Sequence, residues 1–225
     1  MRAMESDLRS GAAALGLSLT DAQFAQLLDY MELIGKWTKV YNLTAVRDPA
    51  EMLTHHLLDS LAVVLPLQRQ LGQMSAAGAL RADAPVRLLD VGSGAGLPGA
   101  VIAICCPQVS VHCVDTVAKK AAFIQQVAVS LKLPNLRGIH ARVENLTETY
   151  DVVSSRAFAA LVDFVNWSIK SLAEQGVWMA MKGKHPADEM AALPAGVEVF
   201  HVEPLVVPGL QAERCIVWMR HRLPT

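Results

Sequence analysis

The chain carries the stretch VRLLDVGSGAGLPG at residues 86–99, where an apolar run ends in an acid and glycines then alternate. Glycine adopts positive φ and has no Cβ, so a ligand can lie directly against the main chain. The helix predicted to follow points its free N–H groups and the positive end of its dipole at that ligand. The stretch therefore predicts a strand, a turn and a helix that together hold a nucleotide or a nucleoside.

The glycines of this stretch fit two registers. The spacing of Gly94, Gly96 and Gly99 matches the dinucleotide fingerprint, in which a pyrophosphate lies on the helix N-terminus. The pattern Asp-x-Gly-x-Gly-x-Gly, which begins at Asp90 and has Gly92 as its first glycine, matches the loop of S-adenosylmethionine-dependent methyltransferases. A plain tight turn between a strand and a helix is the alternative to both.

An acid follows at the end of the next apolar run. Asp115 closes the run that starts at Val111, and it lies about 20 residues after Gly94, the distance at which an acid takes ribose hydroxyls. An acid buried at a strand end needs a polar partner. We therefore predict that Asp115 binds the cofactor in either register.

The composition indicates a globular protein with a sizeable core. The 225 residues are 52% hydrophobic and 18% charged, enough for one large domain with an extension. No apolar run reaches the roughly 18 residues of a membrane helix, and the N-terminus does not resemble a secretory signal. We expect a soluble, cytoplasmic protein without membrane attachment. The net charge of −1 means that any nucleic-acid partner must meet a local basic patch.

Cysteine and histidine spacing gives no sign of a metal site. The four cysteines lie in apolar runs and lack Cys-x-x-Cys spacing, so we expect buried, reduced thiols. His55 and His56 are adjacent on a predicted helix, and their rings therefore face different directions. No metal is expected.

Residues 1–84 have a helical pattern and are predicted to form an extension packed on the core. Thr20 can cap a helix with apolar residues at helical spacing. Asp48-Pro49 begins another helix, which we expect to end near Pro66. Residues 68–84 are predicted to be a loose connection.

Residues 85–225 are predicted to form the cofactor-binding domain. Strands and helices alternate, which implies βαβ units and a mostly parallel sheet with helices on both faces. The last two apolar runs are joined by Pro208-Gly209 and should form an antiparallel hairpin at the sheet edge. The fold class is thus α/β, a doubly wound Rossmann-like class I methyltransferase sheet. Strands are predicted at 86–91, 110–115, 135–140, 150–155, 176–182, 197–207 and 212–220, and helices at 97–106, 117–131, 160–174 and 185–192.

Several blocks of the chain resemble the RsmG (GidB) family. Tyr41–Met52 and His56–Leu61 resemble its N-terminal block, and the glycine stretch is similar to its next one. Arg142-Val143-Glu144, Ser155–Phe158 and Met181-Lys182-Gly183 follow in the family's order and spacing. The resemblance implies a bacterial methyltransferase that uses S-adenosylmethionine to methylate N7 of one guanine in 16S rRNA, near the decoding site. Its partner would be the small ribosomal subunit, and we expect a monomer.

The resemblance also implies a set of site residues. Carried over by position, together with the glycines of the loop, the cofactor contacts are Gly92, Gly94, Gly96, Leu97, Asp115, Val143, Glu144 and Arg156. The RNA contacts are predicted at Asn42, Arg47, Arg156 and Lys182. The chain departs from the family pattern at His55, where we expect Arg or Lys, at Ala95, where Pro is common, and at Ala118.

The chemistry of the acceptor agrees with the absence of an evident catalytic base. Ser154–Phe158 replaces the Asp/Asn-Pro-Pro-aromatic motif of exocyclic-amine methyltransferases, and no cysteine lies where a pyrimidine-carbon methyltransferase needs one. Guanine N7 is nucleophilic without losing a proton, so we assign no catalytic residue. Phe158 is predicted either to stack on a flipped base or to belong to the core.

Two other function classes stay open on the sequence. The Gly94-Gly96-Gly99 register would suit a nicotinamide-dependent oxidoreductase, although no residue is a candidate partner for hydride transfer. A catalytically silent nucleotide-binding regulator, acting through the N-terminal helices, would bind the cofactor without turnover.

Overall fold

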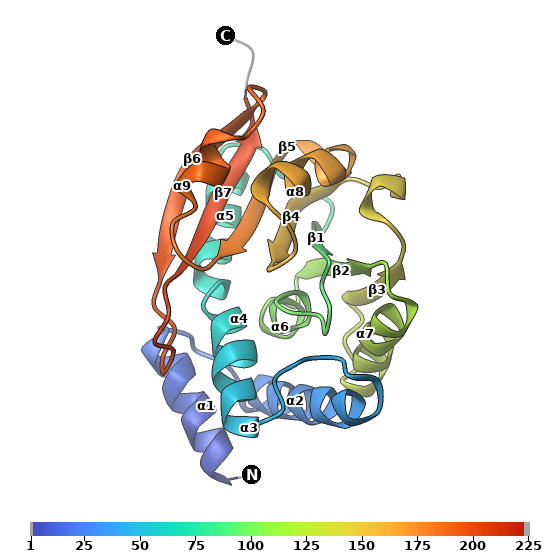
Figure 1. The fold of residues 1–225 in the computed structure, drawn as a ribbon, viewed down its shortest axis with the longest axis vertical. Helices are drawn as coiled ribbons and strands as arrows, with labels where there is room; N and C mark the ends of the chain where they lie inside the picture. Colours follow the sequence, from blue (N-terminus) through green and yellow to red (C-terminus); the bar gives the residue numbers. More distant parts are fainter. Residues whose placement is uncertain (1, 223–225) are drawn as a thin grey trace.

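The computed structural model describes residues 2–222, in which seven strands form one sheet with the order β3-β2-β1-β4-β5-β7-β6 (Figure 1). The first five strands are parallel, and β7 runs antiparallel between β5 and β6. The predicted doubly wound sheet with a C-terminal antiparallel hairpin is confirmed. The strands are β1 (Val86–Val91), β2 (Val109–Asp115), β3 (Leu136–His140), β4 (Tyr150–Arg156), β5 (Leu172–Lys182), β6 (Val197–Leu205) and β7 (Arg214–His221).

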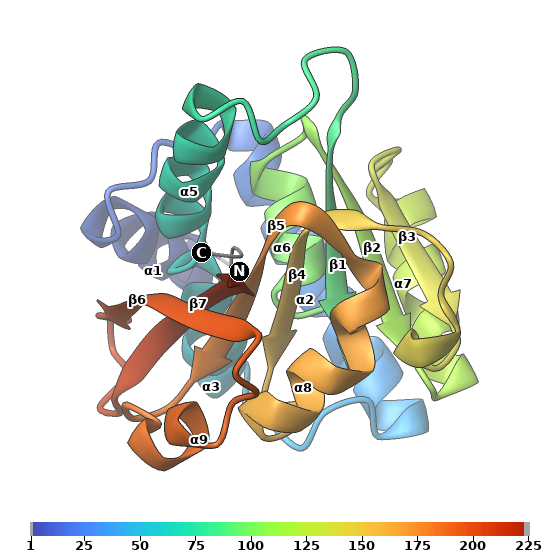
Figure 2. The same ribbon diagram turned by 90° about the horizontal axis from the view of Figure 1, so that it is seen from above.

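Helices cover both faces of this sheet (Figure 2). The N-terminal helices are α1 (Arg2–Ala14), α2 (Asp21–Tyr41), α3 (Pro49–Met52), a π-helical turn (Leu53–Leu58), α4 (Asp59–Leu61) and α5 (Val64–Ala76). The helices between the strands are α6 (Gly99–Cys105), α7 (Ala118–Ser130), α8 (Leu161–Ser168) and α9 (Ala187–Ala191). Single 3-10 turns lie at Val143–Asn145 and Ile169–Ser171. No helix among residues 2–222 is both long enough and apolar enough to span a membrane.

The two faces of the sheet belong to two hydrophobic clusters. Neighbouring residues of a strand point to opposite faces, and Leu88 accordingly lies in one cluster while Leu89 lies in the other. The Leu88 cluster continues into α6, α7 and the N-terminal helices, where it includes Leu27 and Leu57. The Leu89 cluster includes Phe164 of α8. The N-terminal helices therefore share a core with the sheet, and the division at residues 84–85 into two domains stays a prediction.

Both predicted helix caps are confirmed. The Thr20 hydroxyl accepts the Gln23 N–H at 3.2 Å, and the Gln23 side chain accepts the Thr20 N–H at 2.9 Å, which is a capping box. One Asp48 carboxylate oxygen accepts N–H bonds from Ala50 and Glu51. These caps fix where α2 and α3 begin.

Two predicted boundaries are wrong. The helix expected to end near Pro66 is instead interrupted at Ala62–Val63, and α5 continues to Ala76 through much of the predicted loose connection. Proline fits here because it occupies the first turn of α5, where its missing N–H has no intrahelical partner. Leu67, Leu71 and Met74 are buried at helical spacing and stabilise the rest of α5 despite its Gly72.

A third boundary differs at the other end of the sheet. The helix predicted over 160–174 ends as α8 at Ser168, and the chain enters β5 already at Leu172. The Ser168 hydroxyl donates to the Phe164 carbonyl at 2.6 Å and accepts the Trp178 indole N–H at 3.0 Å. This bond from α8 to β5 marks the end of the helix.

Candidate active site

The glycine loop joins β1 to α6 at the carboxyl edge of the sheet, and three of its glycines have positive φ. The values are +63° at Gly92, +58° at Gly94 and +87° at Gly96. Gly99 has another role: a Cβ there would lie 2.5 Å from the Cys113 sulfur. Positive φ disfavours side chains by roughly 1–2 kcal/mol, so the loop requires glycine at the three alternating positions.

A tyrosine of the N-terminal helices holds this loop. The hydroxyl of Tyr30, a fully buried residue of α2, donates to the Ala95 carbonyl at 2.5 Å. Burial raises the pKa of the Tyr30 hydroxyl well above 10, so it is a permanent donor. Tyr30 could not be recognised from the sequence, because its partner atom is a backbone carbonyl 65 residues away.

Beneath the loop lies Asp90, which is fully buried. One of its oxygens accepts the Gly99 N–H at 2.9 Å, and the other accepts the Ser154 hydroxyl at 2.9 Å. Burial outweighs these bonds and raises the pKa of Asp90 from 3.8 to about 6. The acid at the start of the motif thus ties β1, β4 and α6 together below the loop.

Asp115 contacts the same loop from the end of β2. Its two carboxylate oxygens accept the Gly94 N–H at 3.1 Å and the Val117 N–H at 2.9 Å, and the Lys120 ammonium lies 3.8 Å away. A carboxylate oxygen accepts more than one hydrogen bond, so further donors can approach Asp115 from the cavity that it lines.

The first cavity at this edge, which we name the Asp115 pocket, has a volume of about 360 Å³. It brings together four of the predicted cofactor residues, Gly92, Asp115, Val143 and Glu144. The remaining lining residues are Val91, Val114, Thr116, Val117, Lys120, Ala141, Arg142, Ala157, Phe158 and Trp167.

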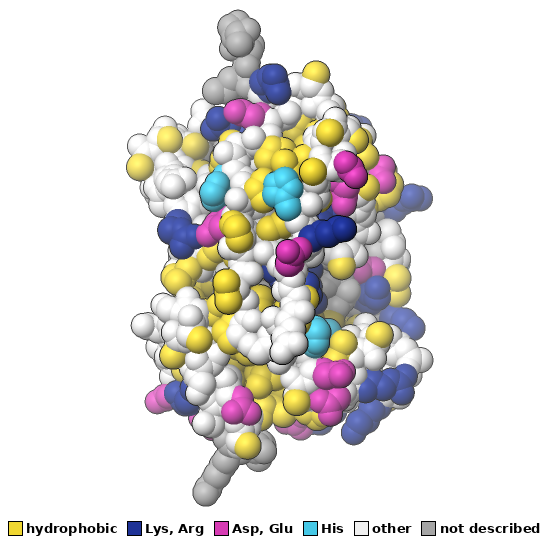
Figure 3. Space-filling view, turned by 60° about the vertical axis from the view of Figure 1, so that its left-hand side comes forward, with side chains coloured by type: hydrophobic (Ala, Val, Ile, Leu, Met, Phe, Trp, Pro, Cys, Tyr) yellow, Lys and Arg dark blue, Asp and Glu magenta, His cyan; other side chains and the backbone are white. Residues whose placement is uncertain are grey.

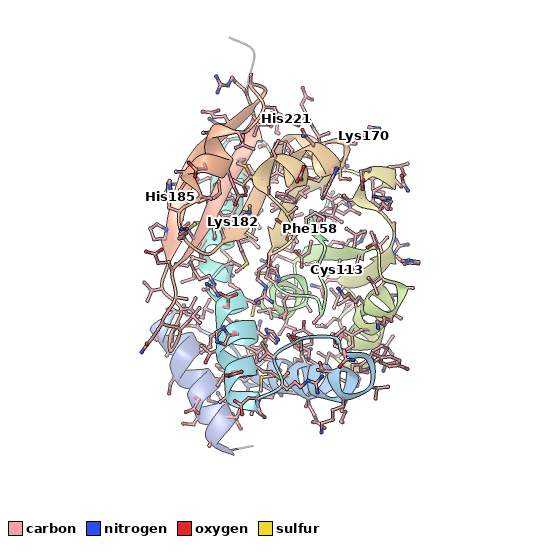
Figure 4. The ribbon with its side chains drawn as sticks, viewed as in Figure 1. Cys113, Phe158, Lys170, Lys182, His185 and His221 are labelled. Atoms are coloured by element: carbon pink, nitrogen blue, oxygen red, sulfur yellow. The ribbon has the colours of Figure 1, made fainter. Side chains whose placement is uncertain are left out.

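Phe158 lines the Asp115 pocket and lies just after the carboxyl end of β4 (Figure 4). Its ring packs edge-on against Trp167 with centroids 5.7 Å apart. The same ring fills the position that a Cβ on Gly92 would need. Phe158 is partly buried, and it both lines the pocket and packs against the Leu89 cluster.

A second cavity, which we name the Asp59 pocket, has a volume of about 480 Å³ and shares Gly92 and Ala157 with the first. It contains three further predicted cofactor residues, Gly94, Leu97 and Arg156, and the predicted RNA residue Lys182. The other lining residues are Leu43, Thr44, His55, His56, Asp59, Ser93, Ala95, Met181, Gly183 and Arg214. Gly96 lines neither cavity, since the space above its Cα is taken by Ile124.

Asp59 of α4 is the centre of a charge network in this pocket. Its side chain is 3% exposed, and its two oxygens accept Arg156 Nη1 and Arg214 Nε, each at 2.8 Å. Arg156 Nη1 also donates to the His55 carbonyl at 3.0 Å. Arg156 was predicted as a site residue, but Asp59 and Arg214 were not, because Asp59 lies 97 residues from Arg156 and 155 residues from Arg214 in the sequence.

Lys182 is fixed at the end of β5 (Figure 4). Its ammonium donates to Glu189 at 2.7 Å and to the Ala159 carbonyl at 2.9 Å. The Glu189 carboxylate also accepts the Leu161 N–H, and these bonds hold the pKa of Glu189 below its usual value in spite of some burial.

His56 is the one titratable imidazole buried in the Asp59 pocket among the described residues. Its Nε2 lies 2.9 Å from the Thr44 hydroxyl. Burial, with the nearby Arg156 charge, lowers the pKa of His56 below 6.5, so the ring is neutral at pH 7.

Asn42 and Arg47 lie outside both pockets. Asn42 ends α2 in the left-handed conformation with φ +50°, and its side chain accepts Arg47 Nη2 at 2.8 Å. Arg47 lines a different cavity, of about 890 Å³, between α1, α2 and α3. Lys36 lines that cavity too and pairs with Glu32.

Around the middle of the face in Figure 3, Lys and Arg alternate with Asp and Glu, so positive charge is not gathered in one patch there.

The four cysteines are buried and unpaired, as predicted. Burial raises the pKa of the Cys113 thiol well above 9, which keeps it protonated below the glycine loop. Among residues 2–222, no group of three or more His, Cys, Asp or Glu side chains is placed to hold a metal ion.

A family model described as "GidB: rRNA small subunit methyltransferase G" matches residues 23–217. Two similar proteins, both named ribosomal RNA small subunit methyltransferase G, come from Polaromonas sp. (strain JS666) and Acidovorax ebreus (strain TPSY). The first is 69% identical over 98% of this chain and 95% of its own, and the second is 68% identical over 96% and 95%.

Solved structures with a similar fold are methyltransferases of low sequence identity. TrmN from Thermus thermophilus is 18% identical, with a TM-score of 0.50 over 76% of this chain and 53% of its own. Coclaurine N-methyltransferase, bound to N-methylheliamine and SAH, is 14% identical, with a TM-score of 0.50 over 89% and 74%. Both likenesses concern the fold alone.

Proposed function

Since the chain belongs to the family of rRNA small subunit methyltransferase G, we propose that it transfers a methyl group from S-adenosylmethionine to N7 of a guanine in 16S rRNA. The observation that carries this proposal is the pair of pockets that meet at Gly92 and Ala157. One pocket suits the nucleoside part of the cofactor, and the other is large and polar enough for a base and its backbone.

The Asp115 pocket fits an adenosine group. Asp115 offers a buried carboxylate to ribose hydroxyls, and the backbone of Gly92, against which the Phe158 ring packs, lines the same pocket. Val143 and Glu144 also line this pocket, and Glu144 is paired only loosely with Arg142 at 3.7 Å. We assign Gly92, Asp115, Val143 and Glu144 to this part of the cofactor.

The remaining cofactor assignments lie across the shared wall. Gly94, Leu97 and Arg156 line the Asp59 pocket and are assigned to the methionine end of the cofactor. Gly96 acts indirectly, because its positive φ shapes the loop without facing either pocket. A cofactor held by both groups of residues would contact the shared wall of Gly92 and Ala157.

The reaction at guanine N7 needs alignment rather than a catalytic base. The cofactor supplies an electrophilic methyl group on a sulfonium. In such a transfer the N7 lone pair would form the new N–C bond, the S–C electrons would return to sulfur, and the positive charge would pass to the base without any proton transfer. Catalysis is then positioning and electrostatics. The neutral His56, hydrogen-bonded to Thr44, fits such a site without acting as a base.

We assign the RNA contacts to the Asp59 pocket and its approach. Arg156 and Lys182 line the pocket, while Asn42 and Arg47 lie on the exposed segment that leads to Leu43 and Thr44 of its wall. The partner is the small ribosomal subunit, and we expect the protein to act on it as a monomer in the cytoplasm. The oxidoreductase and the silent regulator have no support from the relatives, which are named as methyltransferases.

Transfer of labelled methyl tests the proposal directly. The purified protein is incubated with methyl-labelled S-adenosylmethionine and small-subunit particles from cells that lack it, and the RNA is digested to nucleosides. We expect label in 7-methylguanosine. Label in another nucleoside would overturn the N7 assignment, and cofactor binding without label would favour the silent regulator.

A further inference from the structure

Two arginines of the Asp59 pocket are held in a fixed geometry with spare donors. Arg156 comes from β4 and Arg214 from β7, and Asp59 joins them through one oxygen each. Their side chains are 19% and 24% exposed, so the guanidinium groups are largely desolvated but reach the pocket. Because a guanidinium pre-organised in this way loses little side-chain entropy on binding, the pair is suited to hold an anion.

Arg214 has donors left after its internal bonds are counted. Its Nε donates to Asp59, and its Nη1 donates to the Glu213 carbonyl at 2.9 Å. Within residues 2–222, its Nη2 makes no hydrogen bond, and a guanidinium carries five N–H donors in all. At least two N–H groups of Arg214 are therefore free for a ligand.

The charges of the pocket specify what that ligand is. Arg156 and Arg214 share the single carboxylate of Asp59, and Lys182 pairs with Glu189, so these three cations and two anions leave a net charge of +1 and the pocket attracts anions. Arginine binds phosphate through paired N–H groups, and phosphate contacts position a nucleic acid on its protein.

The target base itself is a poor partner for this pair. A donor on guanine N7 would occupy the lone pair that must attack the methyl group. A donor on O6 would draw electron density from the ring, and a free guanidinium charge would oppose the positive charge that forms on the base. The cations are therefore compatible with the reaction when they contact the backbone rather than the base.

We propose that Arg214, held in place by Asp59, binds a phosphate group of the RNA that carries the target guanine. Arg156 is the second arginine of this phosphate site, and Asp59 is its positioning residue. This inference rests on the proposed function and adds a residue, Arg214, and a ligand group to it.

The dependence of binding on salt tests the inference. Each phosphate contact adds about 0.7 to 0.9 to the slope of log affinity against log salt. We expect Arg214→Gln to lower this slope by about that amount for small-subunit particles, and to weaken their binding about 5- to 10-fold near 0.1 M salt. The affinity for S-adenosylmethionine should stay within twofold of wild type.

Arg220→Gln is the matched control. Arg220 lies on the same strand, is also paired with a carboxylate, Glu198 at 3.1 Å, and lies outside the Asp59 pocket. Its substitution should leave the slope unchanged. Arg214→Lys keeps the positive charge, so the salt slope should be unchanged. It should bind the particles more weakly than wild type, because it loses the planar guanidinium with its paired N–H donors.

Asp59→Asn tests the positioning role separately. We expect it to raise KM for the particles at least fivefold with a much smaller change in kcat. If this variant does not fold, the comparison of Arg214→Gln with Arg220→Gln still decides the phosphate contact. An unchanged salt slope in Arg214→Gln, or weaker binding at an unchanged slope, would overturn the inference. A wild-type protein that binds no particles would instead refute the proposed function.

Discussion

The Asp115 pocket and the Asp59 pocket share Gly92 and Ala157 as a wall, yet they are built in different ways. The Asp115 pocket is formed by the carboxyl ends of neighbouring parallel strands, and its acid bonds to backbone N–H groups of nearby turns. The Asp59 pocket is formed by elements from both ends of the chain. Its ion pairs join residues 97 and 155 positions apart.

Because of this difference, we expect substitutions in the two pockets to have different effects. A pocket made of turns and strand ends depends on local backbone geometry, so its substitutions should act on the cofactor. The long-range ion pairs of the Asp59 pocket depend on how the N-terminal helices dock on the sheet, so substitutions in these ion pairs should act on the RNA and on stability. Ala157, which has a positive φ of +49°, lies where the two pockets meet.

The largest effect is expected at Gly92 in the shared wall. A Cβ at Gly92 would collide with the Phe158 ring, and its φ of +63° adds strain of roughly 1–2 kcal/mol. We expect Gly92→Ala to weaken S-adenosylmethionine binding more than about 100-fold, measured by calorimetry. Because 1.4 kcal/mol corresponds to a tenfold change in affinity, the backbone strain alone would weaken binding only about 5- to 30-fold.

Gly94→Ala is the matched control for this substitution. Gly94 has a similar φ of +58°, but a Cβ there meets no heavy atom within 4 Å. We expect a loss of about tenfold, from strain alone. Equal losses in the two variants would show that Phe158 moves aside freely, and the ring would then not be a fixed wall of the Asp115 pocket.

The second prediction compares two buried acids, Asp90 without a cation and Asp59 with two. Asp90 has a pKa of about 6 in the folded protein, against 3.8 as its ordinary value. The folded state then binds more protons than the unfolded state, so this group destabilises the protein as pH rises from about 4 to about 6. A shift of this size corresponds to about 3 kcal/mol.

Asp90→Asn should remove this pH dependence. The amide keeps an acceptor for the Gly99 N–H and can donate to the Ser154 hydroxyl. In urea unfolding, the stability of the variant relative to wild type should rise by about 3 kcal/mol between pH 4 and pH 7. Ser154→Ala, which removes a donor to the carboxylate, should move the transition to higher pH. A difference that does not vary with pH would contradict the raised pKa.

The contrast between the pockets also explains what the sequence could predict. The glycine loop and Asp115 were predictable because a strand, a turn and a helix succeed one another within residues 86–115, and local spacing fixes their geometry. Asp59 and Arg214 were not predictable, because each is an ordinary charged residue until the fold brings them together. The same holds for Tyr30, whose partner is a carbonyl without a side-chain signal.

The helix boundaries near residues 62–76 were predicted wrongly for a related reason. The composition of residues 68–84 indicated a loop, but burial of Leu71 and Met74 against the shared core stabilises α5 through Gly72. Tertiary packing outweighs local propensity in such a segment. The helix caps at Thr20 and Asp48 were predicted correctly, because their hydrogen bonds stay within one turn of the chain.

The third prediction separates the two pockets by their ligands. Asp115→Asn removes one of two acceptors for the Gly94 and Val117 N–H groups and the charge beside the proposed ribose site. We expect about tenfold weaker S-adenosylmethionine binding, with the salt slope for small-subunit particles unchanged. Arg214→Gln should show the reverse pattern. If S-adenosylmethionine binding and the salt slope for the particles fell equally in both variants, the two pockets would not be separate sites.

The smallest effect is expected where the N-terminal helices contact the glycine loop. Tyr30→Phe deletes the hydroxyl that donates to the Ala95 carbonyl, at a cost of about 1–2 kcal/mol in stability for the unpaired buried group. Because that carbonyl belongs to the loop, KM for S-adenosylmethionine should also rise about threefold, while KM for the particles changes little.

Tyr150→Phe distinguishes a local effect on the loop from general destabilisation. Tyr150 is also buried, and its hydroxyl lies 2.9 Å from His112 Nδ1, but it begins β4 and therefore lies at the opposite edge of the sheet. It should lose similar stability without any change in KM. A rise in KM for both variants would mean that the cofactor pocket senses the stability of the whole core, and Tyr30 would then have no particular role in positioning the loop.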